Sequence, residues 1–148
     1  MKTIYRIHNK FYLVFFCLIF CGFLLRLYNI SFASLWSDEL YSMLSIHPSN
    51  SIYEILYMQR KDQPPLYFLL LKFWTFVFGY NDYSARLLSI IIGSAGIYAI
   101  GTVNNYLFNK KVALFSAFIV AFNFRQIEYS LEARFYGLLF LLSIICNS

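Results

Sequence analysis

The chain has 148 residues, of which 60% are hydrophobic, 22% aromatic and only 13% charged. Soluble globular domains carry about 25% charged residues, so this composition excludes a soluble domain and indicates an integral membrane protein. The formal net charge of +5 does not indicate nucleic-acid binding, because the basic residues are scattered between apolar stretches instead of forming a basic stripe.

A first apolar run over residues 11–30 follows a basic tail, 1–10. This run matches the roughly 20 residues that a transmembrane helix needs. A secretory signal peptide has the same pattern, and Ser31-Phe32-Ala33 offers small residues for cleavage. Arg26 interrupts the approach to that point, so we expect an uncleaved first transmembrane helix and a cytoplasmic tail 1–10.

The segment 31–83 is expected to form a large external loop that contains short amphipathic helices near 38–46 and 51–60. Its apolar stretch 66–79 is too short for a typical span and contains Lys72. We therefore expect this stretch to lie along the membrane surface as an interfacial helix.

Two longer apolar stretches follow, 84–108 and 112–127, and a basic turn at 109–111 separates them. If 66–79 stays at the surface, this turn lies on the same side as the basic N-terminal tail, as the positive-inside rule favours. The acidic residues then collect on the opposite, external side of the membrane.

A fourth span is expected to begin at Phe135, after an external turn over 128–134. The sequence thus predicts an all-α integral membrane fold with about four transmembrane helices and interfacial helices in the first external loop. The fourth span breaks off at Ser148, so we expect 1–148 to be the N-terminal part of a longer transmembrane domain.

The densest acidic signal is Trp36-Ser37-Asp38-Glu39, after the first apolar run. Carboxylates at the start of a helix can simply stabilise its N-terminus through the helix dipole. Alternatively, a carboxylate partly desolvated at the membrane surface can act as a general base on an acceptor hydroxyl, an effect worth roughly 10²–10⁴ in rate. Both interpretations stay open, and Asp38 and Glu39 are candidate catalytic residues.

Two further groups of polar residues flank the stretch 66–79. Asp62 and Gln63 precede the rigid Pro64-Pro65 turn, which would hold them at a site, although a solvated loop tip explains them equally well. Asp82 and Arg86 are four residues apart at the start of the second span, where an interfacial ion pair explains them.

The segment from Glu128 to Tyr136 places two acids and an arginine between apolar spans. Simple solvation of a short loop is one explanation. The other is chemical: the guanidinium of Arg134 suits paired, charge-assisted hydrogen bonds to a phosphate, and Glu132 could assist Asp38 or hold a cation.

Three segments together resemble the GT-C class of polytopic glycosyltransferases, in particular the bacterial branch related to protein O-mannosyltransferases and to lipid A aminoarabinose transferases. They are Trp36-Ser37-Asp38-Glu39, the run Gln63-Pro64-Pro65-Leu66-Tyr67 leading into Tyr83-Ser84-Ala85-Arg86-Leu87, and Tyr129-Ser130-Leu131-Glu132-Ala133-Arg134-Phe135-Tyr136. The likeness covers nearly the whole chain from Phe11 onward, and the order and spacing of the segments carry it.

The resemblance implies a multi-pass enzyme of the bacterial inner membrane. It would move a sugar, with inversion, from a polyprenyl-phosphate donor to an envelope glycan, lipid or protein on the external face. In that class Asp38 matches the acid that acts as, or supports, the base. Relatives often carry a further acid inside the fourth span, where this chain has Phe140-Leu141-Leu142, so Glu132 would have to serve and the use of a divalent cation stays open.

The candidate site therefore combines residues from three distant segments: Asp38, Glu39 and Glu132 for catalysis, and Asp62, Gln63, Arg86, Arg134 and Tyr136 for substrate binding. The rival hypothesis is a non-catalytic polytopic membrane protein or a transporter fragment. A transporter buries polar groups or broken helices near the membrane midplane. Here the polar residues gather at the ends of the spans, which favours surface chemistry.

Overall fold

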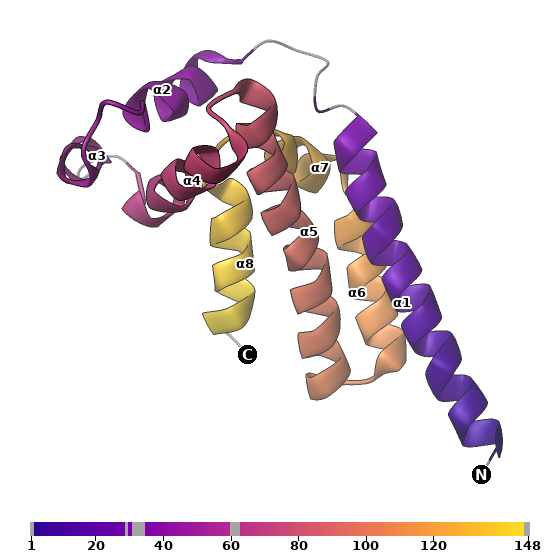
Figure 1. Ribbon diagram of the computed structural model, residues 1–148. Coiled ribbons are helices and arrows are strands. Elements are labelled where there is room, and N and C mark those ends of the chain that lie inside the picture. Colours follow the sequence, from indigo (N-terminus) through magenta and orange to yellow (C-terminus); the bar gives the residue numbers. More distant parts are fainter. Residues whose placement is uncertain (1, 29, 31–34, 60–62, 147–148) are drawn as a thin grey trace.

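The computed structural model (Figure 1) describes residues 2–28, 30, 35–59 and 63–146. Within these ranges every regular element is a helix, which confirms the all-α prediction. The helices are α1 (Lys2–Tyr28), α2 (Ser37–Ser45), α3 (Ile52–Gln59), α4 (Pro65–Phe78), α5 (Asp82–Leu107), α6 (Lys110–Phe122), α7 (Phe124–Leu131) and α8 (Tyr136–Cys146).

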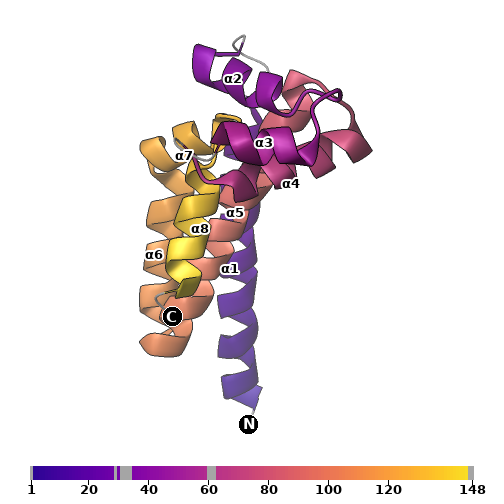
Figure 2. The same ribbon diagram turned by 90° about the vertical axis from the view of Figure 1, so that its left-hand side faces the viewer.

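The long helices form a bundle, and the short ones lie at one end of it. Helix α5 packs against α1, α6 and α8, and α1 also contacts α6. Figures 1 and 2 show α2, α3 and α4 together at one end of this bundle, beside α7. The N-terminus of α1 and the α5–α6 connection lie at the other end. The bundle therefore has two distinct ends.

Fewer helices than expected are long enough to cross a membrane. Among the residues that the structure describes, α1 over Lys10–Tyr28 and α5 over Asp82–Leu107 qualify by length and hydropathy. The pair α7 and α8 qualifies as a third span only if its bend of 119° is accepted. The predicted number of about four transmembrane helices is therefore not confirmed; among the described residues there are two candidate spans, or three with the bent pair.

The expected third stretch, 112–127, is divided between two helices. Helix α6 has 13 residues, and Asn123 leaves the helical conformation with ψ of 121°. The Asn123 side chain then accepts a hydrogen bond from the backbone N–H of Gln126 and starts α7. Residues 128–131, expected in an external turn, are the last turn of α7.

The helices expected near 38–46 and 51–60 are present as α2 and α3. Helix α4 begins at Pro65, where its missing N–H costs no hydrogen bond, and ends at Gly79, whose φ of 98° favours glycine. The ammonium of Lys72 donates to the backbone oxygens of His47 and Asn50 at 2.9 and 2.7 Å. This charge therefore ties α4 to the α2–α3 connection, although the position of α4 relative to the membrane stays a prediction.

The apolar interior has two parts. One lies under α2, α3 and α4 and includes Ile55, Phe68, Leu71 and Ala133. The other joins α1, α5 and α6 through a cluster of Phe15, Ile97, Ala117 and Ala121. Small residues allow close approach of membrane helices, and a Cβ added at Gly101 would lie 2.2 Å from the ring of Phe15. The first part of the core positions the candidate site.

Candidate active site

A buried ion pair joins α2 to α5. The Arg86 guanidinium donates to both carboxylate oxygens of Glu39, from Nη2 to Oε2 at 2.7 Å and from Nε to Oε1 at 3.0 Å. The backbone N–H groups of Ala133 and Trp36 donate to the same two oxygens at 2.9 and 3.2 Å. Glu39 is 1% exposed. All four donors converge on one carboxylate, which fastens three segments of the chain together.

The partners of this carboxylate favour its ionised form. Burial by itself raises the pKa of Glu39, but the hydrogen bond from Arg86 and those from the Ala133 and Trp36 backbones outweigh it and lower the pKa below its ordinary value. Arg86 also donates to the backbone oxygen of Ile30 at 3.1 Å. Because both oxygens of Glu39 already accept two hydrogen bonds, the geometry gives it and Arg86 a positioning role.

A second ion pair lies next to the first and is open to solvent on one side. Arg134 donates from Nη1 to Oδ2 of Asp38 at 2.7 Å, and the Asp38 side chain is 61% exposed while that of Arg134 is 15% exposed. The guanidinium carbon lies 4.9 Å from the ring centre of Tyr136 and 5.7 Å from that of Phe135. The two rings thus hold a covered cation against an accessible carboxylate.

The third candidate acid, Glu132, occupies a different environment. It follows the last residue of α7 and is half-buried. Burial raises its pKa, and the negative charges of Glu39, Glu128 and Asp38 add to that effect against the opposing charge of Arg134. A carboxyl group with a raised pKa accepts a proton more readily near neutral pH. This environment favours the protonated form of Glu132 more than that of an exposed glutamate.

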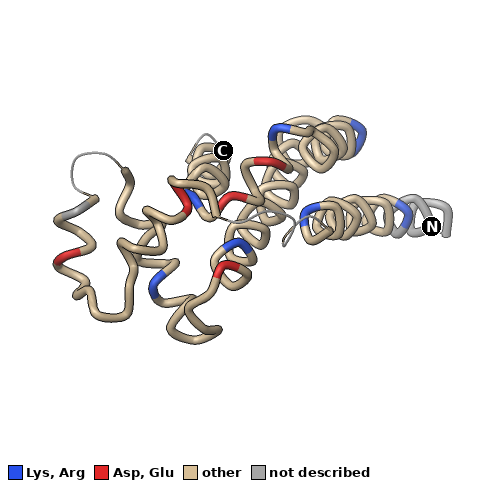
Figure 3. The backbone as a smooth tube through the Cα atoms, turned by 90° about the horizontal axis from the view of Figure 1, so that it is seen from above, with Lys and Arg blue, Asp and Glu red and all other residues tan. Residues whose placement is uncertain are grey.

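The cluster brings together sequence segments that are far apart. Figure 3, which views the molecule from the end that carries α2, α3 and α4, shows acidic and basic positions next to one another near the centre. The contacts of Ala133 with Glu39 and of Arg134 with Asp38 join residues 94 and 96 positions apart. They confirm the expectation that segments 36–39 and 128–136 meet.

For the remaining site residues expected from the sequence, the structure gives fewer contacts or different ones. Gln63 is half-buried, and its side-chain oxygen has no hydrogen-bond partner. Asp62 lies outside the described residues. Arg86 forms its salt bridge with Glu39, so the local pairing with Asp82 considered from the sequence does not explain it. Among the residues that the structure describes, no three His, Cys, Asp or Glu side chains form a group that could hold a metal ion.

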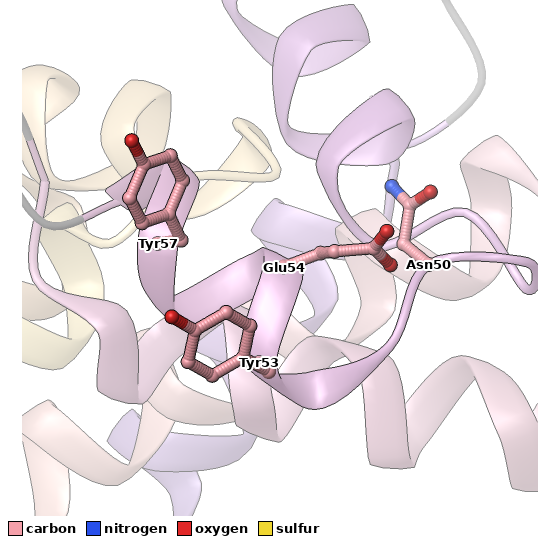
Figure 4. Close-up of a pocket in the computed structure, with 4 residues that line it drawn as sticks. All are labelled: Asn50, Tyr53, Glu54 and Tyr57. Carbon is pink, nitrogen blue, oxygen red and sulfur yellow. The ribbon is translucent and has the colours of Figure 1, made fainter.

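A separate hollow of about 170 Å³ lies on α3 and is lined by Asn50, Tyr53, Glu54 and Tyr57 (Figure 4). The backbone N–H of Ser51 donates to the Glu54 carboxylate, and the Ser51 hydroxyl accepts from the Glu54 backbone. This reciprocal arrangement is a capping box at the start of α3. The acid in the hollow therefore serves the helix end, and none of the lining residues belongs to the Asp38 cluster.

A comparison with models of known protein families shows to which family the chain belongs. A family model described as dolichyl-phosphate-mannose-protein mannosyltransferase matches residues 62–146, more than half of the chain. The chain belongs to this family. A search of curated proteins and a search of solved structures found no match.

Membership of the mannosyltransferase family, together with the apolar helices, makes the chain a membrane glycosyltransferase, and the family suggests a lipid-linked sugar donor. The matched region begins at residue 62 and contains Arg86, Glu132 and Arg134. Asp38 and Glu39 precede it, but their contacts connect them directly to the matched part. The cluster thus combines Asp38 and Glu39, which precede the matched region, with residues that lie within it.

Sequence reasoning missed two members of the cluster, the backbone N–H groups of Ala133 and Trp36 that donate to Glu39. A backbone donor has no signature in residue type. For Ala133 the one signal available was its small side chain, which is fully buried where its N–H contacts Glu39. Arg26 was considered only as an argument against cleavage of a signal peptide, and its contacts with α6 were also missed.

Proposed function

We propose that this chain forms part of the active site of a multi-pass glycosyltransferase of the bacterial inner membrane. The enzyme would transfer a sugar from a polyprenyl-phosphate donor to an envelope glycan, lipid or protein, with inversion, on the external face. The observation that carries the proposal is the Asp38–Arg134 pair, an accessible carboxylate beside a covered guanidinium. A transfer of this kind needs both charges in one place.

The proposed step is a single displacement at the anomeric carbon. Asp38 removes the proton of the acceptor hydroxyl, and the oxygen forms a bond to the anomeric carbon on the face opposite the phosphate. The bond from that carbon to the phosphate oxygen breaks, and the polyprenyl phosphate leaves with the electron pair. Attack from the opposite face inverts the configuration, and Arg134 stabilises the charge that develops on the leaving phosphate.

The ion pair between Asp38 and Arg134 also fits an order of events in which the donor binds before the acceptor hydroxyl is deprotonated. In the described structure the guanidinium contacts Asp38 at 2.7 Å. A donor phosphate is a second anion that competes for the same guanidinium, and its binding would release the carboxylate for the acceptor hydroxyl. Glu132 would support the proton transfer, and Gln63 and Tyr136 are proposed to contribute to donor binding; for Asp62, outside the described residues, the same role is proposed from the sequence alone.

The proposed orientation places the cluster outside the cytoplasm. The tail 1–10 and the turn 109–111 would lie on the cytoplasmic side, and the loop 31–83 and the segment 128–134, which contains the end of α7, on the other. Figure 1 supports the grouping, because the N-terminus and the α5–α6 connection share one end of the bundle and α2 lies at the opposite end.

Cysteine labelling tests this orientation. In a variant in which Cys17, Cys21 and Cys146 are replaced by serine, Asp38→Cys and Glu132→Cys are expected to react with a membrane-impermeant maleimide in intact cells. Lys110→Cys is expected to react only after the membrane is permeabilised. Labelling of position 110 from the same side as position 38 would contradict the proposed topology.

A transfer assay tests the function itself. Membranes that contain the natural protein are expected to move radiolabelled sugar from a polyprenyl-phosphate donor to an envelope acceptor, and not directly from a nucleotide sugar once synthesis of the lipid-linked donor is blocked. Transfer from the nucleotide sugar under that block, without the lipid-linked donor, would refute the proposal.

A further inference from the structure

Arg26 is a fully buried cation within a candidate membrane span. It lies near the end of Lys10–Tyr28, and its exposed fraction is 0%. Charged side chains inside the hydrocarbon region are costly and usually functional. Within the described part of the chain, the ion pairs involve Glu39, Glu128 and Asp38 and none of them includes Arg26. Its burial therefore needs another explanation.

The partners of Arg26 are backbone oxygens, one in its own helix α1 and two at the end of α6. Its Nη1 donates to the oxygens of Gly22 and Ala121 at 2.9 and 3.2 Å, and its Nη2 donates to that of Val120 at 3.2 Å. The last carbonyls of a helix lack partners within the helix and carry partial negative charge. In a membrane such groups are especially unfavourable when unsatisfied. Arg26 thus caps the C-terminus of α6 from a different helix.

The end of α6 determines where α7 begins. Asn123 follows α6 directly and starts α7 through the hydrogen bond from Gln126. Helix α7 then returns against α5, where Ser130 occupies the space beside Gly93: a Cβ added at Gly93 would lie 2.2 Å from Oγ of Ser130 and 3.6 Å from Nε of Arg26. Helices α1, α5 and α7 therefore meet at Arg26 and Gly93.

The turn after α7 follows at once and carries the contacts of the proposed active site. Ala133 and Arg134 come three and four residues after Ser130 and bind Glu39 and Asp38. We propose that Arg26 is a positioning residue: by capping α6 it fixes the start of α7, which Gly93 allows to pack close to α5, and so it sets the position of the Ala133-Arg134 turn. The inference rests on the proposed function, which assigns the Ala133-Arg134 turn to the active site. The effect of Arg26 on the position of this turn can be tested without a transfer assay.

The experiment measures distances between spin labels in the purified chain in lipid nanodiscs, with the three native cysteines replaced. Labels at the exposed residues Leu44 on α2 and Arg125 on α7 report the position of α7. Labels at Leu13 on α1 and Tyr106 on α5, both exposed, report the bundle as a control. Arg26→Leu is expected to shift and broaden the first distance and to leave the second unchanged.

A variant that restores the charge distinguishes capping of the α6 carbonyls from simple packing of the Arg26 side chain. Arg26→Lys keeps a cationic donor for the α6 carbonyls and is expected to restore the Leu44–Arg125 distance in large part. Lys111→Leu removes an exposed cation from the other end of α6 and is expected to change neither distance. An unchanged Leu44–Arg125 distance in Arg26→Leu would overturn the proposal.

If Arg26→Leu also disturbs the control distance, Gly93→Ala tests the next step of the proposal, the close packing of α7 on α5. It keeps Arg26 and its charge, but the added methyl group displaces Ser130 and with it α7. The Leu44–Arg125 distance must then shift while the control distance stays the same, and an unshifted distance would overturn the proposal. None of these outcomes depends on whether the protein transfers a sugar, so failure here is distinguishable from failure of the proposed function.

Discussion

Replacing Arg86 by leucine is expected to lower the free energy of unfolding by about 3–5 kcal/mol, because it leaves the buried Glu39 carboxylate without its counter-ion. The Glu39 and Arg86 side chains are 1% and 7% exposed, so water cannot replace the lost partner. The measurement is denaturant unfolding of the purified chain in detergent, followed by circular dichroism.

Two variants make this prediction specific. Glu39→Gln combined with Arg86→Leu removes both charges but keeps a side-chain oxygen for the Ala133 N–H, so it is expected to recover a large part of the lost stability. Arg125→Leu breaks the exposed pair with Glu128 and should cost less than about 1 kcal/mol. An equally small effect of Arg86→Leu would show that the pair does not anchor the three segments.

The same pair has a defined pH dependence. Because the folded protein lowers the pKa of Glu39 below 4.5, the pair contributes its stability above that value and loses it as the pH falls through the folded pKa. The difference in stability between the unmodified protein and the variant with Glu39→Gln and Arg86→Leu should therefore narrow in acid.

Asp38 and Glu39 show why the sequence could locate the candidate site but could not assign a separate role to each acid. Asp38 and Glu39 are adjacent and of one chemical type, so sequence reasoning treated both as catalytic candidates. Successive residues of a helix point about 100° apart, and α2 turns Glu39 into the core and leaves Asp38 at the surface. Which of the two is buried depends on what α2 packs against, and that information comes from α5 and the turn after α7.

The helix ends were predictable only where a local signal exists. Pro65 and Gly79 mark the limits of α4 in the sequence and in the structure. The end of α6 has no such signal in hydropathy, because the apolar run continues to Ile127 across Asn123. Its carbonyls are satisfied by Arg26, about 95 residues away along the chain. A partner at that separation cannot be read from a local pattern.

Asp38→Asn is expected to reduce the rate of sugar transfer about 10²–10⁴-fold, the range that general-base catalysis contributes. Asparagine has nearly the same shape and can still accept a hydrogen bond from Arg134, so donor binding should persist and the loss should fall on kcat rather than on KM. The measurement is transfer from the polyprenyl-phosphate donor in membranes that contain the natural protein.

The structure also predicts that this loss is not a folding defect. Asp38 is 61% exposed, and exposed ion pairs contribute about 0–1 kcal/mol, so Asp38→Asn should insert into the membrane and unfold like the unmodified protein. Glu54→Gln, which neutralises the exposed acid in the capping box of α3, is the matched control and should keep normal transfer. Near-normal turnover of Asp38→Asn would remove Asp38 from the chemistry. Glu132, whose raised pKa also suits a proton acceptor, would then be the residue to test as the base.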